Sequence, residues 1–335
     1  MKFGTADIRG NINLKSLSGN TLYVGPGCTY TTITLAMAAA AANDTILVAP
    51  GTYAEAVTFT QDGLTLKSIG SKSNTIIALA TTTAAGLVSM STKIDCTIDG
   101  FTINLTAQAT AEKYAVYSAN ASGNNCIKNC DINVTSSVGS LASLGGVNLA
   151  GAGSSEVLNC NVDVTQSSTS GVQTYGITVR SGNRSFINVR LSVSDASTGN
   201  SLVYGYFIGS TTTFTVRECS VKVESAVTTS GVVAGLVSTD DPKVHIYGTD
   251  IDVNCSSTGL AYGTFADAFG SGSALSLYNC TVKAIAVTDG DGTDYIVSDG
   301  TIHVYGGNSL GDVVSSGTVT TLGLVRIGVT SAIVA

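Results

Sequence analysis

The chain has 335 residues and a formal net charge of −7, with 44% hydrophobic and only 12% charged residues. This balance argues against a nucleic-acid partner, because phosphate contacts require clustered Lys and Arg. No apolar run approaches the roughly eighteen residues of a membrane span, so no membrane insertion is expected. The eight cysteines are expected to be unpaired and mostly buried, because a chain of this length can build its own core.

The N-terminal region holds two predicted elements. Residues 1–21 precede the first recognisable element and are predicted to be either an arm outside the domain or an extra edge strand, since residues 6–17 alternate polar and apolar side chains. Residues 31–43, TTITLAMAAAAAN, have the Ala and Leu content of a short helix that ends at Asn43. Residues 22–335 are predicted to form one domain, with a C-terminal cap at 310–335.

From residue 98 onward the sequence repeats every 29 to 31 residues. Each unit has an apolar residue three positions before a central anchor and another two positions after it. Asn or Gly stands directly before the anchor in every unit except the one with Glu218, and these residues tolerate the left-handed conformation of a sharp corner. A period of this length is typical of a solenoid. The anchors are Phe101, Cys130, Cys160, Val189, Cys219, Thr249 and Cys280.

A further strand is expected before each corner, starting near residues 114, 145, 175, 204, 234, 262 and 295. Three parallel strands per turn, joined by loops rich in Ser, Thr and Gly, describe an all-β fold, the right-handed parallel β-helix, of about 9–10 coils. The helix at 31–43 is expected to cap its N-terminal end, because an open solenoid end exposes the core and the strand edges.

Residues 22–59 carry a more specific signal. They contain VGPG at 24–27, the predicted helix, DTILV at 44–48, and a signature made of Gly51, Tyr53 and Glu55. This segment resembles the opening of pectin-lyase-like β-helix proteins, especially pectin methylesterases. The resemblance implies the β-helix fold. Enzymes and non-enzymes of the superfamily share this opening, so the resemblance does not imply an activity.

Few residues match the catalytic pattern of the methylesterases that the segment resembles. GTFADAFG at 263–270 is similar to their GTVDFIFG segment, but Asp267 stands one residue late, and such a shift turns a strand side chain to the other face. No segment similar to their QAVAL and LGRPW motifs is present. Four other residues are weak catalytic candidates because they fall near one corner of different coils, where solvated turn residues are the simpler interpretation. They are Arg180, Asp240, Asp241 and Asp299.

Two groups of residues are candidates for binding. Tyr247, Tyr278 and Tyr305 share one outward position on successive coils, and such a row could bind a glycan or a protein, or simply stack along the sheet. The loop TDGDGTDY at 288–295 has the oxygen spacing of part of a calcium site but lacks the final bidentate Glu, so a flexible acidic turn is the alternative. Its candidate ligands are Asp289, Asp291 and Asp294. No other cofactor is indicated.

The low charge, the variable loops and the missing catalytic set favour a non-catalytic structural or receptor-binding rod on a virion or cell surface. A phage tail spike is the kind of protein that this rod resembles, and the resemblance implies a homotrimer or a virion assembly, with a glycan or host-surface receptor as partner. The alternative is a polysaccharide lyase or hydrolase with an atypical site. Clustered carboxylates on adjacent coils would favour that alternative.

Overall fold

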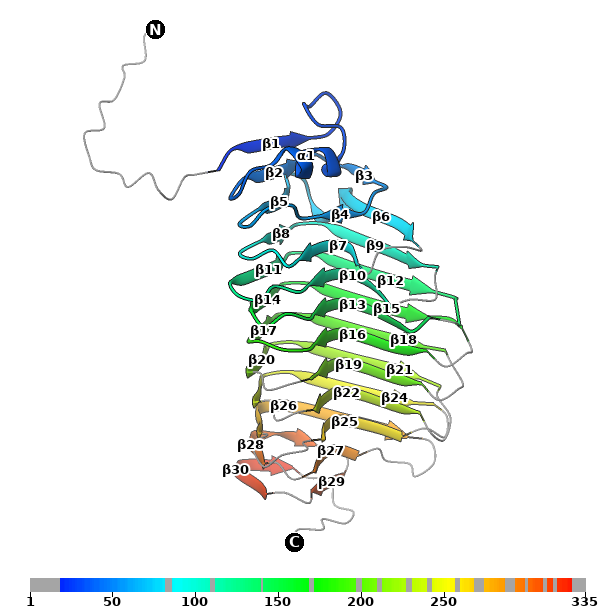
Figure 1. Cartoon of the computed structure of the whole chain (residues 1–335). Coiled ribbons are helices and arrows are strands. Elements are labelled where there is room, and N and C mark those ends of the chain that lie inside the picture. The colour runs from blue at the N-terminus through cyan, green and yellow to red at the C-terminus, as the bar shows by residue number, and fades with distance from the viewer. Residues whose placement is uncertain are drawn as a thin grey trace, which may run out of the picture.

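The fold is seen in a computed structural model that describes residues 19–326, apart from 82–85, 109–111, 140, 169–171, 197–200, 210–212, 227–230, 240–242, 257–259, 268–273, 287–292, 299–300, 310–311 and 316–317. The described chain is nearly all β, and it winds into a right-handed parallel β-helix, as predicted. Figure 1 shows the coils stacked along one axis, from the blue coils beside α1 to the red coil that holds β30.

One sheet of the solenoid stacks ten strands, which come from ten successive coils. Its neighbours pair in parallel and in register, so that Val116, Val147 and Ile177 form one column. The ten strands are β4 (Val57–Thr58), β7 (Gly86–Ser91), β10 (Lys113–Ser118), β13 (Ser143–Leu149), β16 (Gln173–Val179), β19 (Leu202–Ile208), β22 (Val232–Thr239), β25 (Leu260–Asp267), β27 (Thr293–Ser298) and β29 (Asp312–Ser315).

The other sheet has twenty strands and bends around a corner, so that most coils contribute one strand before the corner and one after it. The first row, before the corner, consists of β1 (Thr21–Val24), β2 (Thr45–Val48), β5 (Thr65–Ser68), β8 (Thr97–Asp99), β11 (Asn124–Lys128), β14 (Ser154–Leu158), β17 (Arg184–Ile187), β20 (Thr213–Arg217) and β23 (Lys243–Tyr247).

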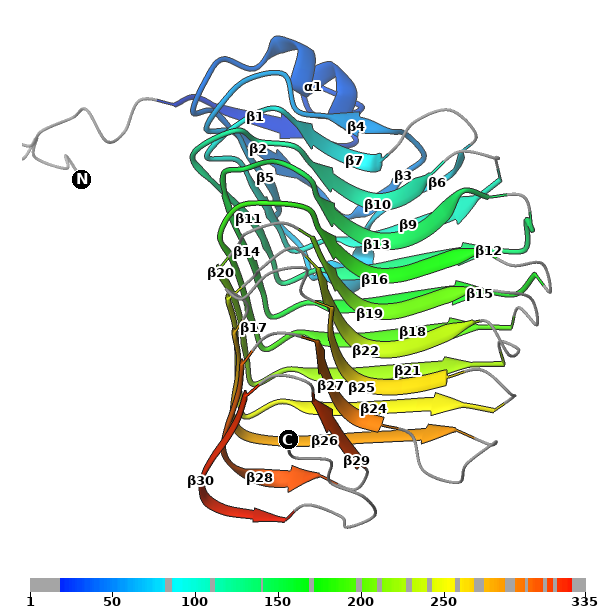
Figure 2. The same ribbon diagram turned by 60° about the horizontal axis from the view of Figure 1, so that its bottom comes forward.

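The second row, after the corner, consists of β3 (Gly51–Tyr53), β6 (Thr75–Thr81), β9 (Thr102–Ala107), β12 (Asp131–Ser136), β15 (Asn161–Gln166), β18 (Arg190–Asp195), β21 (Ser220–Ser225) and β24 (Asp250–Cys255). Three long strands span both rows, namely β26 (Ala274–Ala286), β28 (Thr301–Ser309) and β30 (Thr318–Arg326). In Figure 2 the first row runs down one side of the rod, while the ten-stranded sheet lies against the second row.

The corner is made by the residue directly before each anchor. Asn129, Asn159 and Asn188 have φ values of 56°, 53° and 52°, in the left-handed region where Asn is tolerated better than most side chains. Their amides form a ladder along the rod, because Asn159 Nδ2 donates to Asn129 Oδ1 at 3.4 Å and Asn188 Nδ2 donates to Asn159 Oδ1 at 3.0 Å. The predicted corner is therefore confirmed.

The N-terminal end carries helix α1 (Ile33–Ala39), which is shorter than the predicted 31–43. Glu55 stabilises the start of this helix, because its carboxylate accepts hydrogen bonds from the backbone nitrogens of Ile33 and Thr34, both at 2.8 Å. The hydroxyl of Tyr53 donates to the carbonyl of Ala49 at 2.8 Å. The spacing of Gly51, Tyr53 and Glu55 thus has a structural use, since Glu55 ties this coil to its cap and Tyr53 bonds to the turn before β3. None of the described helices is long and apolar enough to cross a membrane.

The interior is filled by the two apolar columns that flank each corner. Ile127, Val157 and Phe186 lie on one side and Ile132, Val162 and Leu191 on the other, each with an exposed fraction of 1% or less. None of the eight cysteines forms a disulfide, and six of them are buried, while Cys28 and Cys126 are half-buried. The only short 3₁₀ helix within the described residues is η2 (Lys72–Asn74).

The two predicted terminal segments lie partly outside the described residues. Residues 1–18 of the arm and residues 327–335 of the C-terminal cap are among those not described. Within the cap region, β29 and β30 pair with β27 and β28, so the solenoid continues there.

Candidate functional site

The candidate site lies on the outer face of the second row, where two polar columns run along the rod. The column directly after the anchors aligns Thr102, Asp131, Asn161 and Arg190. The column two residues further on aligns Asn104, Asn133 and Asp163. Because side chains alternate between the faces of a strand, both columns point away from the apolar interior. Asp131 and Asp163 therefore lie on the same face of adjacent coils.

Asp131 is held by two donors. Lys72 Nζ donates to Asp131 Oδ1 at 2.7 Å, and Asn161 Nδ2 donates to the same oxygen at 2.6 Å. Lys72 comes from η2, and the hydroxyl of Thr102 in turn donates to the carbonyl of Lys72 at 2.9 Å. These contacts fix the orientation of the Asp131 carboxylate.

Asp163 is paired with Arg190 of the next coil, whose Nη2 donates to Asp163 Oδ2 at 3.0 Å. Arg190 Nε donates to Asn161 Oδ1 at 3.3 Å, which connects this pair to the contacts of Asp131. Partial burial raises the pKa of Asp163, the charge of Arg190 opposes this rise, and the charge of Asp131 adds to it. The neutral acid is thus easier to form at Asp163 than at an isolated carboxyl group.

These residues surround an open hollow of about 250 Å³. Two carboxyl groups that face one hollow, one of them with a raised pKa, are the arrangement that general acid–base chemistry requires. The hollow is lined by Thr102, Asp131, Asn133, Asn161, Asp163 and Arg190.

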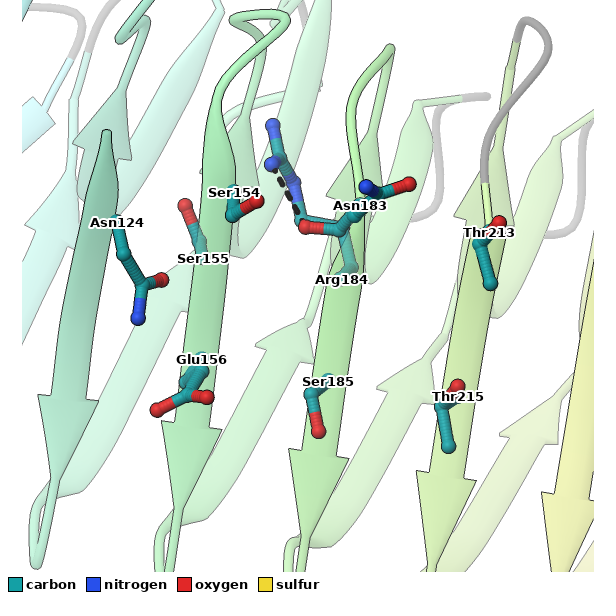
Figure 3. A pocket seen from close by; sticks show the side chains of 9 residues that line it. All are labelled: Asn124, Ser154, Ser155, Glu156, Asn183, Arg184, Ser185, Thr213 and Thr215. Atoms are coloured by element: carbon teal, nitrogen blue, oxygen red, sulfur yellow. Dashed lines mark hydrogen bonds between the residues drawn. The ribbon is translucent and has the colours of Figure 1, made fainter. Parts of the chain in front are cut away.

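A second, larger hollow of about 490 Å³ lies on the first row (Figure 3). Hydroxyl and amide groups dominate its lining, together with one carboxylate and one guanidinium. The lining residues are Asn124, Ser154, Ser155, Glu156, Asn183, Arg184, Ser185, Thr213 and Thr215.

The structure does not bring the predicted catalytic candidates together within the described residues. Arg180 is exposed after β16, and its Nη2 lies 3.6 Å from Oε1 of Glu112. Asp267 ends β25 in the ten-stranded sheet, where its backbone pairs with Thr239 and Ser298. Asp240, Asp241 and Asp299 lie outside the described residues. The catalytic role of these five residues stays a prediction.

The predicted tyrosine row is present on the first row and the strands that continue it. Tyr247 and Tyr278 stack with ring centroids 4.5 Å apart and 7° between their planes, and Tyr278 and Tyr305 stack at 4.5 Å and 2°. The guanidinium carbon of Arg217 lies 4.8 Å from the centroid of the Tyr247 ring. Both faces of the Tyr278 ring are therefore covered, which leaves edges and hydroxyl groups for a ligand. Stacking explains this geometry, and a binding role stays a prediction.

The predicted calcium loop is only partly within the described residues. Asp289 and Asp291 lie outside them, whereas Asp294 belongs to strand β27 rather than to the loop. The loop is shorter than predicted because pairing of β27 with β25 already begins at Thr293. Over the part of the chain that is described, no group of three or more His, Cys, Asp or Glu side chains could hold a metal ion.

The Asp131 and Asp163 pair was missed by the sequence analysis, although the repeat contained its signal. Alignment on the anchors places Asp131 one residue after Cys130 and Asp163 three residues after Cys160. Asp131 and Asp163 thus stand on adjacent coils, which is the criterion that favours a polysaccharide-acting enzyme.

Comparison with known proteins identifies the fold. No protein-family model and no curated protein sequence matches the chain. Among solved structures, the pectate lyase Pel9A matches with a TM-score of 0.59 and 13% identity, over 94% of this chain and 82% of that one. A pectin methylesterase from carrot matches with a TM-score of 0.44 and 12% identity, over 92% of this chain and 89% of that one. The pectin methylesterase PemA from Erwinia chrysanthemi matches with a TM-score of 0.41 and 14% identity, over 91% and 93%.

The chain is therefore a parallel β-helix protein with the fold of a pectate lyase. At 13% identity this likeness concerns the fold alone.

Proposed function

We propose that the chain is a polysaccharide hydrolase whose active site is the hollow between Asp131 and Asp163. The observation that carries this proposal is the position of two carboxyl groups on adjacent coils, with the pKa of Asp163 raised by partial burial. The pectate lyase of the same fold supports a polysaccharide as the substrate class, since a solenoid offers a long face to an extended polymer.

In the proposed reaction Asp163, in its protonated form, donates its proton to the oxygen of the glycosidic bond as the carbon–oxygen bond breaks. Asp131 accepts a proton from the water molecule that adds to the anomeric carbon. Lys72 and Asn161 keep Asp131 oriented for this step through the hydrogen bonds described above. Arg190 has to release Asp163 for its protonation, because the ion pair at 3.0 Å favours the charged form.

The test is a reducing-end assay on soluble polysaccharides, including polygalacturonate and a neutral glucan. Asp163→Asn and Asp131→Asn are each expected to lower the rate of cleavage at least about a hundredfold, the usual contribution of a general acid or base. Asp252→Asn is the matched control, because Asp252 occupies the column of Asp163 three coils further on. Cleavage that survives both substitutions would contradict the proposal.

A non-catalytic rod of the virion or cell-surface kind is the second candidate. It is favoured by the ion pairing of both carboxylates, since Asp131 is paired with Lys72 and Asp163 with Arg190. In this case the same hollow would bind a glycan receptor without cleaving it, and the N-terminal arm would join the rod to an assembly. Retained binding of a polysaccharide with no release of reducing ends over the whole panel would favour this candidate.

A further inference from the structure

The larger hollow contains an unusual inward column on the first row. On adjacent coils this column aligns Asn125, Ser155 and Arg184, and the following coils place Phe214 and Val244 in the same position. The fold therefore accepts an apolar residue there, and a guanidinium group is not needed to build the coil. Figure 3 shows Ser155 on β14 and Arg184 on the neighbouring strand β17.

The guanidinium of Arg184 is buried among backbone carbonyls. Its Nη1 donates to the carbonyl of Asn183 at 3.1 Å and also to that of Gly153, and its Nη2 donates to the carbonyl of Gly151 at 2.5 Å. Only 2% of Arg184 and 2% of Ser155 is exposed. Two buried atoms that face this column, Arg184 Nε and Ser155 Oγ, have no hydrogen-bond partner.

The charge of Arg184 is not compensated within the described part of the chain. None of the ion pairs found there includes Arg184, and burial lowers its pKa to about 10 with no neighbouring carboxylate to oppose the shift. A buried cation without a counter-charge is costly. Ser155 and Arg184 pair in register on adjacent strands, so their unused O–H and N–H belong to neighbouring positions of the column and are the kind of donors that an anion requires.

We propose that Arg184 and Ser155 form a binding site for a small monovalent anion, either free chloride or a carboxylate group. Arg184 Nε–H and Ser155 Oγ–H are the two donors, and the guanidinium supplies the compensating charge. The site is separate from the Asp131 and Asp163 hollow, because it lies before the corner and the carboxylate pair lies after it. It stands whether or not the chain cleaves a polysaccharide.

The test is chloride NMR on the full chain, in which bound chloride broadens the resonance of the free ion. The unmodified protein is expected to broaden the chloride line in a saturable way. Acetate and galacturonate are then added as competitors, with galactose as the neutral control. Displacement by both carboxylates identifies a general anion site, and displacement by galacturonate alone identifies a site for an anionic sugar.

Ser155→Ala is the decisive variant, because Ser155 Oγ makes no hydrogen bond whose loss would disturb the fold. It is expected to retain the thermal unfolding midpoint of the parent in anion-free buffer and to weaken chloride binding about tenfold, as for the loss of one hydrogen bond to a charged group. Arg184→Met is expected to abolish the broadening. Arg180→Met, which removes an exposed arginine directly after β16, is the control and is expected to leave the broadening unchanged.

Two results would overturn the proposal. One is the absence of saturable broadening in the unmodified protein, which would mean that water and not an anion satisfies Arg184 Nε and Ser155 Oγ. The other is broadening that Ser155→Ala and Arg184→Met leave as strong as in the Arg180→Met control, which would place the chloride elsewhere on the surface. Chloride broadening in the Asp163→Asn variant equal to that of the unmodified protein would show that the anion site is independent of the proposed active site.

Discussion

At the scale of single residues, the corner position decides where each strand ends. Seven coils use this position, and Glu218 is the only member that is neither Asn nor Gly, yet it has the same φ of 53°. A side chain with a long stem in the left-handed region costs about 1–2 kcal/mol, which Asn reduces and Gly avoids. The corner geometry is thus imposed on Glu218 by the coils above and below it.

Replacement of this residue should stabilise the protein. Glu218→Asn is expected to raise the free energy of unfolding by about 1 kcal/mol, because Asn tolerates the left-handed region and extends the amide ladder beyond Asn188. Chemical denaturation with an unchanged m value is the measurement. Glu156→Asn, in the extended strand β14, is the control and is expected to bring no such gain. A Glu218→Asn variant no more stable than the parent chain would contradict the explanation.

At the scale of elements, the cap of the first coil depends on one carboxylate. α1 has seven residues, too few to be stable alone, and Glu55 satisfies two of the backbone nitrogens at its start. The helix therefore remains folded because β3 and the turn after it hold Glu55 in place.

Loss of this carboxylate should loosen the cap. Glu55→Ala is expected to lower the free energy of unfolding by about 1–2 kcal/mol, because two backbone donors lose their acceptor and the helix dipole loses its counter-charge. Glu55→Gln keeps one acceptor oxygen and is expected to cost less. Hydrogen exchange of the α1 amides, measured beside chemical denaturation, locates the effect. Equal exchange in all three proteins would show that Glu55 does not hold the helix.

The elements could be predicted from the sequence far better than the site. Apolar columns such as Ile127, Val157 and Phe186 recur in every unit, because each has to fill the same interior. The outward columns carry no such constraint, so Asp131 and Asp163 differ from their counterparts in the neighbouring coils. The partner of Asp131 is Lys72, 59 residues away in a segment before the aligned repeats, and no periodic pattern could have indicated that contact.

At the scale of the whole molecule, one buried and one half-buried thiol link stability to pH. Burial raises the pKa of Cys96 and of Cys126 from 9.0 to about 11. The unfolded chain therefore loses these protons first as the pH rises, so the stabilisation is fully present below pH 9 and is lost towards pH 11.

Alkaline conditions should accordingly destabilise the rod. Between pH 8 and pH 10 the free energy of unfolding is expected to fall by about 1 kcal/mol for each of these two thiols. Chemical denaturation at the two pH values measures this fall. The Cys96→Ala variant is expected to lose the part of the fall that comes from Cys96. The explanation would be wrong if the variant kept the full pH dependence. All eight thiols should also be titratable after denaturation, since none forms a disulfide.

The register of the coils also sets how such a molecule can change in length. Neighbouring corners such as Asn129 and Asn159 are 30 residues apart, and the columns of the aligned repeats recur every 29 to 31 residues. An insertion of one residue within a strand turns all following side chains of that strand to the opposite face, whereas duplication of a whole coil restores every column one step of about 4.8 Å further along the axis. The rod can therefore be lengthened with all of its columns intact only by the addition of whole coils.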